Sequence, residues 1–211
     1  MADRVPELVI GDDGVGRCWW SAGSPEYRAY HDREWGFPVT DDQRLFEKIS
    51  LEGFQAGLSW IMVLRKREGL RRAFHGFDFR RLARVRETSV DRLLEAPVMI
   101  RNRAKVKSVL NNARRAVEMV KEEGSLARFL WRYEPAARSG AKRLTRDQLR
   151  LMTTCPEAEA MSRELKRRGW TFVGPTTMYA LMQAMGLVND HLHSCPAGRR
   201  SADFRRSLVR P

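Results

Sequence analysis

The segment Leu51–Trp60, LEGFQAGLSW, holds one carboxylate inside an apolar run and ends in an indole. At about 100° per residue, Glu52 shares the apolar stripe of a helix with Leu45, Ile49 and Ala56. A carboxylate on that stripe is costly to bury unless another group compensates it. Glu52 therefore either pairs with an arginine or a buried backbone group, or it faces a ligand.

Small residues lie beside this carboxylate in the sequence. Gly53, Gly57 and Ser59 would leave room for a flat ligand or for the close approach of another backbone. The segment is therefore a candidate pocket, with Glu52 as its charged group.

Two cysteines and two histidines form a second candidate site. Twelve residues separate Cys18 from His31, and three separate His191 from Cys195, so the second pair could reach one ion from a helix. Two thiolates and two imidazoles make a closed tetrahedral Zn²⁺ site, which is structural because no position remains for a catalytic water. Alternatively, the cysteines pack as small hydrophobic residues and the histidines are ordinary polar groups. His193 competes with His191 as the ligand.

A basic corner between two expected helices could bind an anion. The turn in residues 95–103 precedes a helix N-terminus, where free backbone N–H groups favour phosphate. Arg101, Arg103 and Lys105 add positive charge there. These features suit a DNA phosphate, and they suit a solvated basic surface equally well.

Aromatic residues cluster in sequence near both candidate sites. Bases stack on such rings, although the same rings also fill protein cores. The residues concerned are Tyr27, Tyr30, Trp35 and Trp60.

Helices must position these groups, because no segment of any length alternates with the period of a strand. Apolar residues from Val106 to Val120 recur at helical spacing and predict a helix over 101–120 that Gly124 ends. Capping residues and prolines predict further helices over 24–35, 41–56, 59–74, 89–96, 125–133, 156–168 and 175–185. We predict an all-α fold with a flexible arm (1–16), one helical domain (17–196) that includes a loop at 135–142, and a basic mobile tail (197–211).

The charge balance favours a polyanionic partner. The chain has 211 residues, with 39 Lys and Arg against 26 Asp and Glu, a net charge of +13. Nucleic acid is the first candidate, and a basic surface without a specific partner is the alternative. No stretch approaches the roughly 18 apolar residues of a membrane span, and the N-terminus lacks the apolar core of a signal peptide. Three widely spaced cysteines are a poor disulfide framework, so we expect a reduced, cytoplasmic protein.

Three blocks of sequence, YHDREWG, LEGFQAGLSW and GLVNDH, resemble the 3-methyladenine DNA glycosylase I family, and the likeness extends from Cys18 to Cys195. The resemblance implies a helical fold of the helix-hairpin-helix glycosylase superfamily. It also implies a monofunctional enzyme that hydrolyses the N-glycosidic bond of 3-methyladenine, releases the base and leaves an abasic site. The implied partners are double-stranded DNA with alkylated bases and free 3-methyladenine, and we expect a monomer.

The same resemblance implies roles for individual residues. A structural zinc would join the N- and C-terminal parts through Cys18, His31, His191 and Cys195. Glu52 would contact the base as the catalytic residue, Tyr30 and Trp60 would sandwich it, and Tyr27 and Trp35 would line the pocket. The turn departs from the family pattern, since it carries Pro97 and no glycine.

A stacked base is out of reach in duplex DNA, so the enzyme must flip it out. The alkylated base is cationic, and an ionised Glu52 would favour it over neutral adenine. Stacking of the cation on Trp60 and Tyr30 adds roughly 0.5–2 kcal/mol per contact. Gly57 and Leu58 are candidates for the wedge that fills the vacated stack. Two alternatives are a protein that binds alkylated bases without excising them and a zinc-stabilised DNA-binding or interaction module.

Overall fold

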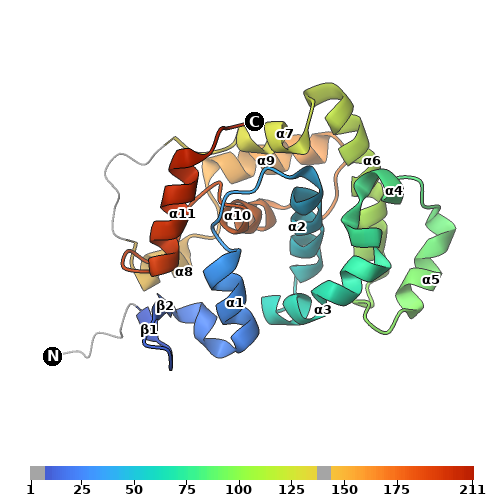
Figure 1. The fold of residues 1–211 in the computed structure, drawn as a ribbon. Coiled ribbons are helices and arrows are strands. Elements are labelled where there is room, and N and C mark those ends of the chain that lie inside the picture. The colour runs from blue at the N-terminus through green and yellow to red at the C-terminus, as the bar shows by residue number, and fades with distance from the viewer. Residues whose placement is uncertain (1–7, 137–143) are drawn as a thin grey trace. The chain divides into compact units, whose positions relative to one another are not determined.

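The structure is a computed structural model that describes residues 8–136 and 144–211, and its elements are mostly helices (Figure 1). The strands are β1 (Leu8–Ile10) and β2 (Gly16–Cys18), and the 3₁₀ helices are η1 (Trp19–Gly23), η2 (His75–Phe77) and η3 (Glu87–Ser89). The α-helices are α1 (Pro25–Arg33), α2 (Asp42–Gln55), α3 (Trp60–Ala73), α4 (Phe79–Leu82), α5 (Val90–Glu95), α6 (Arg103–Glu123), α7 (Leu126–Trp131), α8 (Arg146–Leu151), α9 (Pro156–Arg167), α10 (Pro175–Ala184) and α11 (Pro196–Ser207). The expected helical class is confirmed.

Two compact units make up the described chain. Residues 8–38, 134–136, 144–153 and 182–209 belong to the first, and residues 39–133, 154–181 and 210–211 belong to the second. The single domain expected over residues 17–196 stays a prediction. Residues 1–7 of the expected arm and most of the expected loop at 135–142 lie outside the described residues.

The first unit begins with a strand pair where we expected a flexible arm. Strands β1 and β2 are antiparallel, with Leu8 opposite Cys18. The Arg17 guanidinium donates to Asp13 in the turn and to Asp32 in α1, which fastens the hairpin to the helix. The arm prediction is therefore corrected for residues 8–16. Each strand has three residues, too few for alternation to be visible in the sequence.

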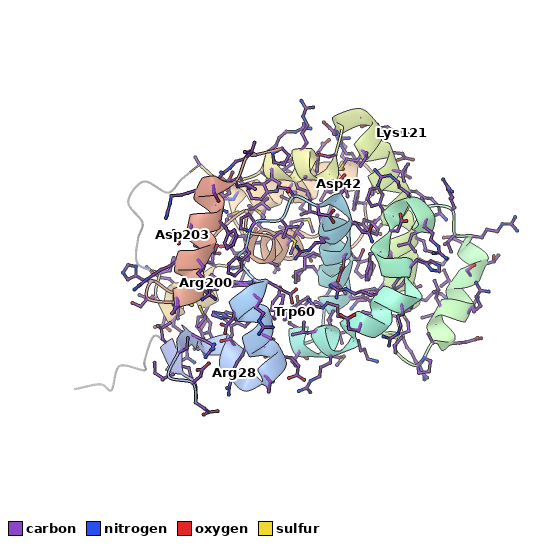
Figure 2. All side chains as sticks on the ribbon, in the orientation of Figure 1. Arg28, Asp42, Trp60, Lys121, Arg200 and Asp203 are labelled. Atoms are coloured by element: carbon purple, nitrogen blue, oxygen red, sulfur yellow. The ribbon has the colours of Figure 1, made fainter. Side chains whose placement is uncertain are left out.

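The first unit ends with α11, where we expected a mobile tail. Ser201 is fully buried and its hydroxyl donates to the Gly36 carbonyl. The Arg205 guanidinium donates to the Gly186 carbonyl and to Glu134. Figure 2 shows Arg200 and Asp203 on this helix. The tail prediction is therefore corrected over 197–207. A few buried contacts hold this helix in place, and its mostly polar sequence does not indicate which residues face inward.

The second unit is built around α2 and α6. Helix α2 packs against α3, α6 and α7, and its inward face buries Phe46, Ile49 and Phe54. The Asp41 side chain caps its first turn by accepting from the Arg44 N–H. Gly124 ends α6 in the left-handed conformation (φ 88°), as the sequence predicts. In the part of the chain that the structure describes, no helix is both long and apolar enough to cross a membrane.

Candidate functional sites

Glu52 lies near the C-terminal end of α2 and is 5% exposed. Its partner is Lys48, one turn earlier on the same helix, whose Nζ lies 2.9 Å from Glu52 Oε1. The same Nζ lies 3.5 Å from the centroid of the Trp60 ring, and Trp60 opens α3 (Figure 2). The three side chains form a charged and aromatic cluster within the second unit, which we call the Glu52 cluster.

Lys48 is the residue of this cluster that our sequence reasoning missed. We expected Glu52 either to pair with an arginine or a backbone group or to face a ligand. In the structure it pairs with a lysine that is itself only 5% exposed. The sequence contains a signal for this pair, because Lys48 and Glu52 are four residues apart and such residues are neighbours on one face of a helix. The sequence does not predict the contact of Lys48 with Trp60, since that contact depends on how α3 packs after α2.

Lys105 holds the end of α2 and does not face the surface. Its Nζ donates to the carbonyls of Phe54 and Ala56, at 2.9 Å in the first case, and the residue is 7% exposed. Burial lowers the pKa of its ammonium group. The predicted contact of Lys105 with DNA phosphate is therefore corrected. The ammonium group instead satisfies carbonyls at a helix C-terminus, which a lysine does well.

The loop between α2 and α3 is short and exposed. Gly57 has a φ of 75°, which only glycine adopts at little cost. The Leu58 N–H donates to the Gln55 carbonyl at 2.6 Å, and the Leu58 side chain is half-buried. The predicted wedge residues thus lie in a turn held between Lys105 and the start of α3, and their role stays a prediction.

The expected basic corner joins α5 to α6, which pack together. Arg101 and Arg103 are exposed, and the Arg103 guanidinium pairs with Asp91 of α5. The Asn102 side chain caps α6 by accepting from the Lys105 N–H at 3.1 Å. Two of the three predicted basic residues are therefore at the surface, and one of the amides at this helix start is already bonded.

Three predicted base-binding residues belong to the first unit, where they surround an indole. The Trp20 ring lies 5.9 Å from Tyr27, 6.3 Å from Tyr30 and 5.0 Å from Trp35, centroid to centroid. Tyr30 is 4% exposed, whereas Tyr27 and Trp35 are half-buried. Our sequence reasoning missed Trp20, although it lies only two residues after Cys18. The contacts with Tyr27 and Trp35 are edge-to-face and the contact with Tyr30 is tilted, and ring contacts of these kinds favour particular orientations.

The four predicted metal ligands converge in the first unit. One donor atom from each of them lies within 4.8 Å of the others, and all four residues are buried. Cys195 Sγ lies 3.5 Å from His31 Nε2 and 3.5 Å from His191 Nδ1, and Cys18 Sγ lies 3.7 Å from His191 Nδ1. His193 is exposed and does not belong to this group.

The second nitrogen of each histidine is held by an oxygen. His31 Nδ1 lies 2.8 Å from the Asp32 carboxylate, which Arg17 also binds. His191 Nε2 lies 3.0 Å from the Trp35 carbonyl and can only donate to it. In the neutral ring each lone pair then points at the sulfur atoms, which is the arrangement that metal-binding histidines use.

The two thiols also fit a cation. The hydrogen bond with Cys195, together with burial, raises the pKa of the Cys18 thiol well above its usual range. Two buried thiolates in contact repel each other, which favours the protonated form of at least one of them. A bound divalent cation offsets this repulsion and favours two thiolates. Two sulfur atoms and two imidazole lone pairs at one point therefore make a donor set that suits Zn²⁺.

Comparison with known proteins identifies the family of this chain. Residues 19–198 match the family model described as methyladenine glycosylase. The DNA-3-methyladenine glycosylase of Haemophilus influenzae is 44% identical over 183 residues, which covers 85% of this chain and 96% of that protein. DNA-3-methyladenine glycosylase 1 of Escherichia coli is 43% identical over 179 residues, with 85% and 95% covered.

Solved structures give the same result. A crystal structure of 3-methyladenine DNA glycosylase I has a TM-score of 0.79 at 45% identity and covers 85% of this chain and 98% of that one. The 3-methyladenine DNA glycosylase I from Staphylococcus aureus, solved to explain 3-methyladenine recognition, has a TM-score of 0.80 at 31% identity, with 86% and 96% covered. This chain belongs to the methyladenine glycosylase family.

Proposed function

We propose that this protein is a monofunctional DNA repair glycosylase that hydrolyses the N-glycosidic bond of 3-methyladenine in DNA. It releases the base and leaves an abasic site. The observation that carries this proposal is the buried Glu52 carboxylate beside the face of Trp60, in a chain similar over most of its length to enzymes named for that base.

Recognition rests on charge, because methylation at N3 gives the base in DNA a positive charge. A buried carboxylate stabilises a cation and penalises a neutral ring that cannot compensate it. The Trp60 face adds a cation–π contribution of roughly 0.5–2 kcal/mol. We propose further stacking and shape selection by Tyr27, Tyr30 and Trp35, after the base has left the duplex.

We also propose a structural zinc ion bound by Cys18, His31, His191 and Cys195. A tetrahedron with Zn–S of about 2.3 Å and Zn–N of about 2.05 Å has sulfur–nitrogen edges of about 3.6 Å. The sulfur–nitrogen separations of 3.5–3.7 Å support this geometry. With four protein ligands the ion would bind no water, so its contribution would be to hold β2, α1 and the segment before α11 together.

For DNA binding we propose a helix-hairpin-helix element made by α5, the turn 96–102 and α6. Arg101 and Arg103 would contact phosphates, and Gly57 and Leu58 would fill the vacated stack. Phosphate contacts release counterions, so the affinity for DNA should fall steeply as salt rises. We further propose that the protein acts as a monomer in the cytoplasm, which size-exclusion chromatography and cell fractionation would check.

The decisive experiment is base release from DNA treated with a methylating agent, with the products identified by chromatography. The wild-type protein should release 3-methyladenine, and Glu52→Gln should lose this activity while it keeps its fold. Glu159→Gln is the matched control, because it makes the same chemical change at an exposed position on α9. Wild-type binding without release would favour the alternative of an alkylated-base binder, and neither binding nor release would refute the proposal.

A further inference from the structure

Lys48 already occupies the place of a cation in the Glu52 cluster. Its ammonium group is 2.9 Å from the Glu52 carboxylate and 3.5 Å from the Trp60 ring centroid. These two interactions, a carboxylate and an aromatic face, are the ones that a cationic base needs. The lysine is buried with its partner, so the contact is not a screened surface pair.

We propose that Lys48 is a resident cation, which holds the charge-recognition position in the free protein and leaves it when a cationic base arrives. This inference rests on the proposed function, since it names the group that the substrate displaces. A lysine suits the role, because its charge is compact and its four-carbon stem is flexible. The ammonium group can therefore move toward solvent while the stem stays packed.

Electrostatics explains why the exchange selects for charge. Two cations beside one carboxylate repel each other, so the base and the ammonium group cannot both remain. When a cationic base enters, it compensates Glu52 in place of Lys48. A neutral adenine that displaces the ammonium group from the Trp60 ring supplies no charge in its place, so it leaves a buried carboxylate without a partner, which is strongly unfavourable. The resident lysine thus makes the entry of a neutral base more costly than an empty apolar pocket would.

The reaction itself reverses the exchange. The bond between C1′ of the sugar and N9 of the base breaks, and its electron pair goes to N9, so the cationic base leaves as neutral 3-methyladenine. A water oxygen then bonds to C1′, and the water gives up one proton to solvent. The neutral product no longer compensates Glu52, so Lys48 returns to the carboxylate and the ring and favours release of the product.

Calorimetric titration with 3,9-dimethyladeninium tests the proposal, because this ion has a fixed positive charge and a methyl group in place of the sugar. Lys48→Met removes the competing cation, so we expect it to bind the ion about tenfold more tightly than wild type, which corresponds to one cation–π and ion-pair contact. Lys48→Arg keeps a cation there and should restore the weaker affinity. Product inhibition by 3-methyladenine should become stronger in Lys48→Met.

Lys121→Met is the matched control, since it makes the same change in net charge at an exposed position on α6. Unchanged or weaker binding of the ion by a folded Lys48→Met protein would overturn the proposal. If that variant does not fold, the NMR signal of the Lys48 Nζ group in the wild-type protein is the measurement. It should shift on saturation with the ion, and an unchanged signal would overturn the proposal. Base release by the wild type distinguishes this failure from failure of the proposed function.

Discussion

Loss of the proposed zinc ion should destabilise the protein strongly, because the four ligands close one very long loop. About 180 residues separate Cys18 from Cys195. If the metal acts as a cross-link, closing such a loop removes roughly 5 kcal/mol of chain entropy from the unfolded state. A protein of this size loses about 2–4 °C in Tm per kcal/mol. Removal of the ion should therefore lower Tm by about 10–20 °C.

The assay compares thermal unfolding of the purified protein before and after treatment with a strong chelator, and again after zinc is restored. Elemental analysis of the untreated protein gives the metal content. Cys195→Ser should lower Tm as the chelator does. Cys155→Ser is the control, because Cys155 lies outside the four-ligand cluster. Its sulfur accepts from the Ala158 N–H at the start of α9, a capping role that serine fills well. The four-ligand site would be refuted if the untreated protein contains no metal and its Tm is unchanged by both the chelator and Cys195→Ser.

Three other predictions follow from single side chains. Lys105→Met should lower the free energy of unfolding by about 1–3 kcal/mol, measured with urea, because it removes the donor from the buried Phe54 carbonyl and from the Ala56 carbonyl. It should leave the salt dependence of DNA binding unchanged. A reduced salt slope would instead restore Lys105 as a phosphate contact. Hydrogen bonds from Arg167 and Arg168 lower the pKa of Glu164 to about 2, so its contribution is complete above the unfolded pKa and disappears as pH falls toward 2. The difference in Tm between wild type and Glu164→Gln should shrink over that range, and a constant difference would contradict this. Gly186→Ala should give little soluble protein, because a Cβ there would lie 2.5 Å from the Pro38 nitrogen and the residue has a φ of 73°. A variant with the Tm of the wild type would show instead that the backbone shifts to accommodate the methyl group.

Helices were largely predictable because their signals are local. The apolar spacing and the Gly124 stop predicted α6 to within a few residues, and Asp41, the first residue of the helix predicted over 41–56, caps α2. Such signals act within one or two turns of chain. The hairpin β1–β2 and helix α11 escaped prediction, since contacts from distant residues such as Asp32 and Gly36 hold them in place.

Charge in the sequence does not reveal burial, and the two lysines of the site illustrate this. Lys105 follows two exposed arginines and resembles them in sequence, yet its ammonium group is buried against the end of α2. The sequence pattern indicates that Lys48 is an ordinary basic residue of an amphipathic helix, yet the structure buries it with Glu52. Where a long side chain ends depends on the neighbouring helices, which the local pattern does not contain.

By itself, the sequence determined the helical class, the family blocks and the carboxylate on an apolar stripe, because residue type and short-range spacing specify all three. It also named four possible metal ligands, but their spacing across nearly the whole chain left two readings open. Only the tertiary structure decided that the four donor atoms meet within 4.8 Å and that Lys48 lies over Trp60 beside Glu52. The physical reason is that a distance between segments far apart in the chain is set by packing, and packing is a property of the folded whole.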